Sequence, residues 1–294
     1  MIGPFLRSCR PKEWSKNLLL FAGVIFSHHV TDTDYLFRAL LGFALFSATA
    51  SGIYLLNDLM DREKDLAHPV KRHRPIASGR LPARAAWAGV ILLAPVSLGL
   101  GYAVWPSFWA SLTAYFILNF AYSVRLKHMV ILDVMAISVG FLIRAIAGVQ
   151  VLHAVDPSVL LSPWLLVCTF FASLFVAVCK RRSELILLET NAGEHRASLD
   201  HYSPSLTDHM ITVTAAATVL SFSLYTIWPD TVEKFGTESL IYTVPFVAYG
   251  LFRYMYLVLE KGKGGNPADL LFSDRPLLLN ILLWTAAVLF ILYL

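Results

Sequence analysis

Residues 35–57 read YLFRALLGFALFSATASGIYLLN and continue directly into the acidic segment DLMDREKD at residues 58–65. The apolar stretch carries a single charge, Arg38, and as a helix it is long enough to cross a hydrocarbon core about 30 Å thick. Carboxylates follow immediately at its end. The sequence therefore predicts a membrane helix that ends in an acidic cluster.

The whole chain has the composition of a membrane protein. Of its 294 residues, 57% are hydrophobic and 15% are charged, whereas soluble domains carry about 25% charge. We expect an all-α, polytopic membrane protein that forms one integral membrane domain over residues 1–294. Nine predicted transmembrane helices follow from the apolar segments, which lie at residues 15–30, 35–57, 86–105, 107–123, 131–152, 160–179, 209–228, 238–259 and 276–294.

The distribution of positive charge predicts the orientation in the membrane. Lys and Arg collect in cytoplasmic loops. With a cytoplasmic N-terminus, 20 of the 24 Lys and Arg residues fall in segments on the inner side, and so does the acidic segment. We therefore expect a multi-pass protein of the cell inner (plasma) membrane whose active site faces the cytoplasm.

The acidic segment is the first candidate site. Asn57, Asp61 and Asp65 are spaced four apart, so on a helix they share one face, and Asp58 lies on its flank. Oxygen ligands at this density suit Mg²⁺, which binds through a few carboxylates and keeps further positions for water or phosphate oxygens. The pattern predicts Asn57, Asp61 and Asp65 as metal ligands, with Asp58 and Asp61 as catalytic residues. The alternative is a solvated helix end that happens to be acidic.

A basic segment, HPVKRHRP at residues 68–75, follows the carboxylates. Lys71, Arg72 and Arg74 are candidates for binding a diphosphate or a sugar phosphate, because arginine forms paired hydrogen bonds to phosphate oxygens. The alternative is positive charge that serves only the topology. The sequence leaves open whether His68 and His73 take part.

A third group follows the predicted helix 107–123. Tyr122 and Lys127 are candidates for binding substrate, and Asp133 is a candidate catalytic residue, either as a metal ligand or as the partner of Lys127. Arg144 lies three helical turns after Asp133, roughly 16 Å away. Charges inside a bilayer are costly and mark a function or a buried partner. Arg144 therefore binds a phosphate deep in a cavity or pairs with a carboxylate for folding.

A fourth group is the run of cations Lys180, Arg181 and Arg182. Cations at the end of a membrane helix commonly anchor it at the membrane surface. Because Glu184 lies beside them, an ordered network that binds substrate is the second interpretation.

The acidic segment resembles a known family motif. NDLMDREKD, residues 57–65, is similar to the NDxxDxxxD motif of the UbiA superfamily of intramembrane prenyltransferases, and YSVRLK at 122–127 followed by Asp133 resembles its second motif. One branch of the family, which transfers a phosphoribosyl group, is indicated by further stretches: RPKEWSKN at 10–17, HPVKRHRPIASG at 68–79, KRRSEL at 180–185 and DRPLLL at 274–279.

The resemblance implies a UbiA-like helical bundle and an Mg²⁺-dependent enzyme. In the branch indicated, the 5-phosphoribosyl group passes from 5-phosphoribosyl diphosphate to a polyprenyl (decaprenyl) phosphate for cell-wall arabinan precursor synthesis. Lys16, Lys127 and residues 180–182 are then candidates for holding the two phosphates. Typical family members carry a second acidic cluster, DxxxD, whereas here Asp133 is followed four residues later by Ile137.

Two other functions compete with this one. An ordinary UbiA-type prenyltransferase, joining a prenyl diphosphate to an aromatic acceptor, would share the metal site but is expected to have the second acidic cluster. A transporter would distribute charge through the membrane interior, whereas here the charges collect at one face. No nucleic-acid-binding module is apparent.

Overall fold

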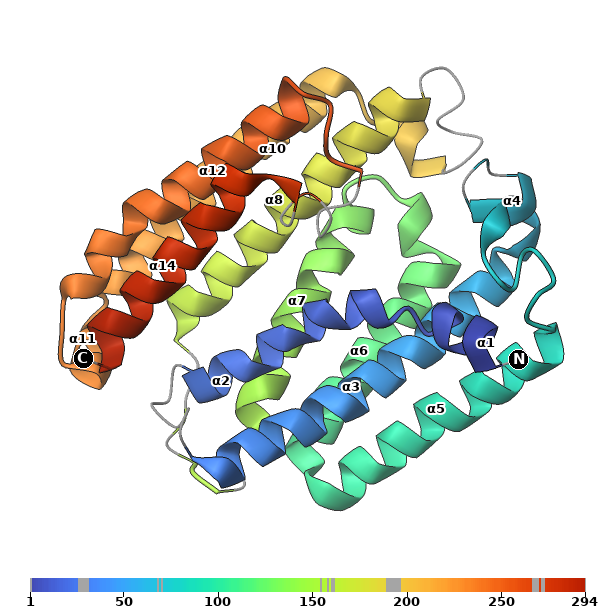
Figure 1. Cartoon of the computed structure of the whole chain (residues 1–294), viewed down its shortest axis with the longest axis horizontal. Coiled ribbons are helices and arrows are strands. Elements are labelled where there is room, and N and C mark those ends of the chain that lie inside the picture. Colours follow the sequence, from blue (N-terminus) through green and yellow to red (C-terminus); the bar gives the residue numbers. More distant parts are fainter. Residues whose placement is uncertain are drawn as a thin grey trace. The chain divides into compact units, whose positions relative to one another are not determined.

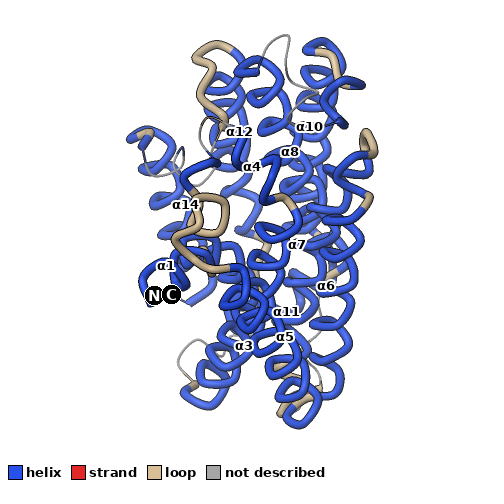
Figure 2. The backbone as a smooth tube through the Cα atoms, turned by 90° about the vertical axis from the view of Figure 1, so that its right-hand side faces the viewer, coloured by secondary structure: helices blue, strands red, loops and turns tan. Residues whose placement is uncertain are grey.

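The structure is a computed structural model that describes residues 2–25, 32–67, 69, 71–153, 155–157, 159, 162–188, 197–265, 270 and 273–293. Helices and the turns between them make up all of this described part, and it contains no β-strand (Figures 1 and 2). The predicted all-α fold class is therefore confirmed. His68 and the end of the first predicted span lie outside the described residues.

The chain divides into two compact units. Unit 1 comprises Met1–Leu126 and Val139–Leu161, and unit 2 comprises Lys127–Ser138 and Ser162–Leu294. Helix α7 (Leu132–Gln150) contributes its first residues to unit 2 and the remainder to unit 1.

Unit 1 is built around the long helix that the sequence predicted. Helix α3 packs along its length against α5 (Figure 1). The approach is close, since a Cβ at Gly52 of α3 would lie 3.3 Å from the Cβ of Ala94 in α5. The elements of unit 1 besides α7 are α1 (Ile2–Ser8), η1 (Pro11–Phe21), α2 (Ala22–Ile25), α3 (Thr33–Met60), α4 (Arg62–Ala67), η2 (Lys71–His73), α5 (Ala83–Val104) and α6 (Pro106–Val124).

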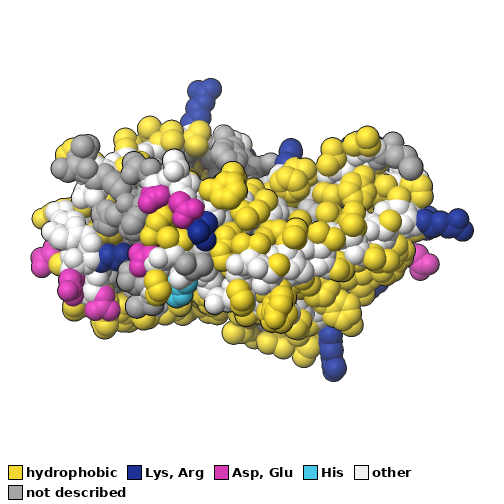
Figure 3. Space-filling model, turned by 90° about the horizontal axis from the view of Figure 1, so that it is seen from below, with side chains coloured by type: hydrophobic (Ala, Val, Ile, Leu, Met, Phe, Trp, Pro, Cys, Tyr) yellow, Lys and Arg dark blue, Asp and Glu magenta, His cyan; other side chains and the backbone are white. Residues whose placement is uncertain are grey.

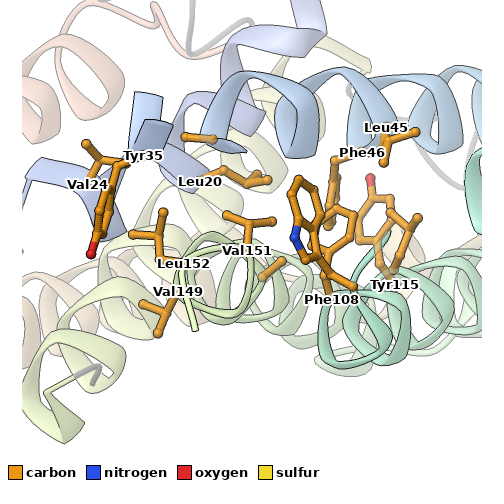
Figure 4. Close-up of a cluster of buried hydrophobic side chains, with 14 of the residues drawn as sticks. Leu20, Val24, Tyr35, Leu45, Phe46, Phe108, Tyr115, Val149, Val151 and Leu152 are labelled. Carbon is orange, nitrogen blue, oxygen red and sulfur yellow. The ribbon is translucent and has the colours of Figure 1, made fainter. Parts of the chain in front are cut away.

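Large apolar side chains fill the interior of unit 1. Figure 4 shows Phe46 of α3, Phe108 and Tyr115 of α6, and Val151 and Leu152 after α7 in one cluster. The rings of Phe46 and Tyr115 have centroids 4.5 Å apart. Packed aromatic pairs of this kind stabilise a core beyond the area they bury, so this cluster holds α3 against α6.

Unit 2 is organised around α8 and α10, which pack side by side (Figure 1). Its core joins Phe175 of α8, Ile211 of α10 and Tyr254 of α12. The elements of unit 2 are α8 (Pro163–Leu188), η5 (Ala197–His201), α10 (Pro204–Ile227), α11 (Pro229–Phe235), η6 (Ser239–Thr243), α12 (Val244–Leu259) and α14 (Arg275–Tyr293), while η3 (Leu126–His128) lies at the division of the units.

Local chemistry explains where several helices begin. The Asp32 side chain accepts a hydrogen bond from the backbone N–H of Asp34 before α3, and Ser203 accepts one from Leu206 at the start of α10. These side chains satisfy N–H groups that have no partner within the helix. Pro106 begins α6, where its missing N–H costs nothing.

Seven helices in the described part are long and apolar enough to cross a membrane. They are α3, α5, α7, α8, α10, the η6–α12 pair and α14. Hydrophobic side chains cover most of the face seen in Figure 3, and exposed apolar residues line α5 and α14, among them Ile91 and Phe290. A surface of this kind requires lipid rather than water, so the chain is a multi-pass membrane protein.

Two of the nine predicted spans are not among these seven. The span predicted at 107–123 is the helix α6, whose Ser, Thr, Tyr and Asn residues lower its hydropathy. The described part of the span predicted at 15–30 is the 3₁₀ segment η1 followed by the single turn α2.

The η1 segment and the turn α2 that follows it pack unusually close to α7. A Cβ at Gly148 would lie 2.3 Å from the carbonyl oxygen of Leu20, and one at Gly23 would lie 2.7 Å from the carbonyl oxygen of Gly148. Only glycines allow two backbones to approach this closely. The approach fixes the position of η1 within unit 1.

Candidate active site

The acidic motif lies where α3 ends and α4 begins. Helix α3 ends at Met60, Asp61 follows with φ −95° and ψ 9°, and α4 starts at Arg62. The backbone N–H of Asp61 donates to the carbonyl of Asn57 at 2.9 Å, and that of Asp65 donates to Asp61 at 2.8 Å. Helical register therefore continues across the break, although the motif does not lie on one uninterrupted helix as the spacing alone suggested.

Two carboxylates of the motif are buried and share one cation. Asp58 is 2% and Asp65 is 3% exposed. The Nη1 atom of Arg74 lies 2.7 Å from Oδ2 of Asp65 and 3.1 Å from Oδ1 of Asp58. Buried carboxylates persist in charged form only when they are paired and hydrogen-bonded. The structure thus brings together Asp58, Asp65 and Arg74, which the sequence had assigned to two neighbouring segments.

Asn57 and Asp61 complete the motif. The side-chain oxygen of Asn57 is buried and has no hydrogen-bond partner in the described part of the chain. An orphaned buried oxygen is costly unless a donor or a cation binds it. Asp61 is half-buried. This oxygen set fits a hard cation, although among the described residues no group of three or more His, Cys, Asp or Glu side chains converges as a metal site.

Arg10 is a site residue that the sequence did not single out, although it opens the RPKEWSKN stretch. Its guanidinium pairs with Asp58 and lies over the Tyr54 ring, 4.9 Å from the ring centroid. Its backbone has φ 52°, a left-handed conformation that costs about 1–3 kcal/mol in a non-glycine residue. The RPKEWSKN stretch could have pointed to Arg10. Its contact with Asp58 was not predictable, because the two residues are 48 positions apart in the sequence.

Apolar side chains hold these segments together beneath the charges. Cys9, Leu55, Ile76 and Leu81 form one buried cluster, with Phe5 packed against it. It joins the N-terminal segment, the end of α3 and the loop before α5. The arrangement of Arg10, Asp58 and Arg74 therefore rests on a packed apolar base.

A pocket of about 230 Å³ opens above this base. The residues that line it in the described part are mostly cationic; they are Arg7, Arg10, Asp58, Lys71, His73, Arg74 and Pro75. Two other predicted cations do not line it: Arg72 is exposed and donates to His73 at 3.4 Å, and Lys16 is exposed and pairs with Glu13.

Asp133 lies in unit 2, where it is fully buried. It accepts hydrogen bonds from the Tyr202 hydroxyl at 2.8 Å and from Ser198 at 3.3 Å, and it forms an ion pair with Nε of Arg181 at 3.1 Å. Burial, and then the Asp133 charge, raise the pKa of the Tyr202 phenol, so the hydroxyl remains a donor. No local pattern in the sequence pointed to Tyr202 or Ser198.

The same hydroxyl supports a strained turn. Ile131 has φ 69°, which is a genuine outlier for a β-branched residue. Its backbone N–H donates to the Tyr202 hydroxyl at 2.9 Å. Tyr202 therefore joins the strained Ile131 backbone to the Asp133 carboxylate.

The neighbouring cations Arg181 and Arg182 have different partners. Arg181 is buried and also pairs with Glu184, so this cation belongs to an ordered ion-pair network, while a contact with substrate stays a prediction. Arg182 instead lies 2.8 Å from Asp208, and Lys180 is half-buried. Arg181 and Arg182 therefore pair with different carboxylates. Of the remaining candidates, Tyr122 is half-buried near the end of α6 and Lys127 is half-buried within η3.

Arg144 is buried in the interior of unit 1. It donates to Asn17 at 2.8 Å, to the Tyr115 hydroxyl at 2.7 Å and to the carbonyl of Gly140 at 3.0 Å. Its guanidinium lies 4.6 Å from the Tyr115 ring centroid. The partners of Arg144 within the described residues are neutral, so they do not include the carboxylate partner that the sequence offered as one explanation.

Known proteins resemble this chain over almost its whole length. It is 32% identical to the decaprenyl-phosphate phosphoribosyltransferase of Mycolicibacterium smegmatis, covering 98% of this chain and 92% of that protein. It is 31% identical to the protein of the same name from Mycobacterium tuberculosis, covering 98% and 94%.

The fold also matches solved structures. A UbiA homolog from Archaeoglobus fulgidus bound to GPP and Mg²⁺ has a TM-score of 0.72 and 19% identity, covering 99% of this chain and all of that one. Residues 18–273 match the model of the UbiA prenyltransferase family. With the NDLMDREKD motif at the end of α3, these matches show that the chain belongs to the UbiA prenyltransferase family.

Proposed function

We propose that this chain transfers the 5-phosphoribosyl group of 5-phosphoribosyl diphosphate to a polyprenyl phosphate, releasing diphosphate. The observation that carries the proposal is the convergence of Arg10, Lys71 and Arg74 on the acidic motif in unit 1. A site with this charge suits a highly phosphorylated, water-soluble donor. The name of the relatives that share about a third of its residues supports the same reaction.

A divalent ion, Mg²⁺, fits the acidic motif. Asn57, Asp61 and Asp65 would hold it, because the unpartnered Asn57 oxygen and the carboxylates supply hard oxygen ligands. The archaeal homolog bound to Mg²⁺ supports such an ion in this fold. When bound, the ion would neutralise charge on the diphosphate leaving group.

Lys71 and Arg74, which lie beside the acidic motif, would also assist the departure of the diphosphate. In the proposed reaction the bond between C1 of the ribosyl group and the diphosphate oxygen breaks, and its electron pair leaves with the diphosphate. Lys71 and Arg74 would stabilise the growing negative charge through fixed donors, the form of electrostatic catalysis that commonly contributes most. Asp58 holds Arg10 and Arg74 in place for this role.

The acceptor needs little activation. A phosphate oxygen of the polyprenyl phosphate forms the new bond to C1, and this monoester is already ionised near pH 7. A strong general base is therefore not required, which agrees with His73 being exposed and bound to Arg72.

The remaining predicted roles are part of the proposal. They comprise a catalytic role for Asp133 and substrate contacts by Lys16, Arg72, Tyr122, Lys127, Arg144, Lys180, Arg181 and Arg182. The buried pairing of Asp133 with Arg181 and Tyr202 supports a positioning role for this carboxylate.

We also propose nine transmembrane spans in a single domain, with the N-terminus and the active site on the cytoplasmic face of the plasma membrane. The support is the charge distribution, since loops rich in Lys and Arg remain in the cytoplasm. The product would be a precursor for cell-wall arabinan.

A donor assay tests the reaction. Purified protein in detergent receives Mg²⁺, labelled phosphoribosyl diphosphate and a polyprenyl phosphate, and labelled lipid is expected. Asp61→Ala should abolish labelling while the variant keeps the melting temperature of the wild type within a few degrees. Turnover of a prenyl diphosphate without use of the ribosyl donor would contradict the proposal and indicate an ordinary prenyltransferase.

A further inference from the structure

We infer that the pocket above Asp58 binds a second phosphate group of the donor, the monoester on the ribose, and that Arg7 and Arg10 are its specific ligands. This inference rests on the proposed function and names the part of the donor that the acidic motif does not hold. It assigns a role to the turn between α1 and η1, where Arg7 and Arg10 lie.

The charge of the pocket points to a dianion. Among its described lining residues, Arg7, Arg10, Lys71 and Arg74 are cationic and Asp58 alone is acidic. The Asp58 carboxylate already pairs with both Arg10 and Arg74. Because Lys71 and Arg74 serve the diphosphate in the proposed reaction, Arg7 and Arg10 remain for the monoester, which carries about −1.5 to −2 charge near pH 7.

The Arg7 side chain keeps its hydrogen-bond donors available for a ligand. This side chain is exposed and has no hydrogen bond or ion pair within the described part of the chain. In their contacts with Asp58 and Asp65, Arg10 and Arg74 each use one terminal nitrogen. Since a guanidinium has five N–H donors in a planar fork, these arginines keep donors for phosphate oxygens.

The backbone presents Arg7 and Arg10 together. The N–H of Arg10 donates to the carbonyl of Arg7 at 3.2 Å, which closes a turn at the end of α1. The left-handed conformation of Arg10 belongs to this turn. Below it, Phe5 and Cys9 pack into the apolar base with Leu55. Backbone strain supported by packing is typical of binding sites.

The size and the lining distinguish a sugar phosphate from a lipid. The pocket of about 230 Å³ is smaller than the roughly 300–1,000 Å³ of sites for larger ligands. Pro75 is the single apolar residue among the described lining residues. A polyprenyl tail requires an apolar groove, whereas a phosphorylated ribose fits a small polar pocket, so we assign the pocket to the soluble donor rather than to the lipid phosphate.

The test is direct binding of ribose 5-phosphate to the purified full chain in detergent, by isothermal titration calorimetry. Arg7→Gln should raise its Kd about tenfold or more, because one charge-assisted contact is lost. Arg84→Gln is the matched control, since Arg84 is an exposed arginine of unit 1 outside the pocket. Its Kd should equal that of the wild type.

Two further ligands identify the source of the phosphate. Unphosphorylated ribose should not bind. Farnesyl phosphate should bind Arg7→Gln and wild type equally. If Arg7→Gln weakens farnesyl phosphate instead of ribose 5-phosphate, the pocket holds the lipid phosphate and the assignment to the donor is wrong.

The outcomes separate this inference from the proposed function. Transfer from phosphoribosyl diphosphate together with an unchanged ribose 5-phosphate Kd in Arg7→Gln overturns the inference alone. Binding that depends on Arg7, without any transfer, overturns the proposed reaction but leaves the pocket assigned. Absence of ribose 5-phosphate binding to the wild type overturns the inference.

Discussion

The Nη1 atom of Arg74 lies 2.7 Å from the Oδ2 atom of Asp65, so a cation from the loop before α5 pairs with a carboxylate of the acidic motif. The same nitrogen reaches Asp58. Sequence spacing groups Asp65 with Asn57 and Asp61, whereas the structure pairs it with Asp58 through Arg74. The acidic motif and the basic segment therefore form one unit of the candidate site.

Replacing Arg74 with Gln should destabilise the protein and weaken donor binding. It leaves Asp65 buried without its cation, and hydrogen bonds to charged groups contribute about 1.5–3 kcal/mol. Because the Arg74 side chain is 29% exposed, we expect about 1–2 kcal/mol. Unfolding in mixed detergent micelles measures the loss, with Arg84→Gln as the control. An unchanged free energy of unfolding would mean that the pair contributes nothing.

Tyr202→Phe should destabilise unit 2. The change removes one donor from the buried Asp133 carboxylate and the acceptor of the Ile131 N–H. Asp133 keeps its contacts with Ser198 and Arg181, so we expect a loss of about 1–3 kcal/mol in total. Tyr242→Phe, on a residue that is 75% exposed, should change stability by less than about 0.5 kcal/mol. Equal effects of the two substitutions would contradict a structural role for the Tyr202 hydroxyl.

Gly148→Ala should loosen the contact between η1 and α7. Its Cβ would lie 2.3 Å from a backbone oxygen, which cannot move aside cheaply, and overpacking of this kind costs about 1–3 kcal/mol. Gly99→Ala is the matched control within α5, where a Cβ meets nothing within 4 Å. It should be neutral or stabilising by up to about 1 kcal/mol. Thermal melting of both variants compares them, and a neutral Gly148→Ala would refute the close approach.

The pair between Arg253 and Asp274 should make stability depend on acidic pH. The hydrogen bond from Arg253 holds the pKa of the Asp274 carboxyl below its usual value. The pair therefore stabilises the fold fully above the unfolded-state pKa of about 3.9, and this contribution is lost as the pH falls through the lower, folded-state pKa.

Asp274→Asn isolates this effect, because an amide oxygen can still accept the Leu277 N–H that begins α14. Its melting temperature should lie below that of the wild type at pH 7, and the difference should shrink as the pH drops below about 4. A constant difference from pH 7 to pH 3 would show that Asp274 does not act through its charge.

The sequence predicted most of the fold because long apolar segments leave few alternatives to membrane helices. It was less accurate at 15–30, where the chain forms the 3₁₀ segment η1. This segment packs against Gly148, which is about 130 residues away from Leu20 in the sequence, and local hydropathy carries no information about such a contact.

The candidate site was predicted in part. Helical spacing identified the acidic motif, since Asn57, Asp61 and Asp65 keep their backbone register. The side-chain partners of the carboxylates were not predictable from the sequence. Arg10 contacts Asp58, and Tyr202 contacts Asp133, only because tertiary packing brings distant segments together. Adjacent cations in sequence also diverged: Arg181 and Arg182 bind different carboxylates, since neighbours on a helix point about 100° apart.

The most direct test of the proposed reaction is the stoichiometry between products when phosphoribosyl diphosphate and a polyprenyl phosphate are supplied together with Mg²⁺. One free diphosphate should appear for each phosphoribosyl lipid formed, and neither product should appear when the polyprenyl phosphate is omitted. Diphosphate released from a prenyl diphosphate, with the ribosyl donor left intact, would contradict the proposed reaction.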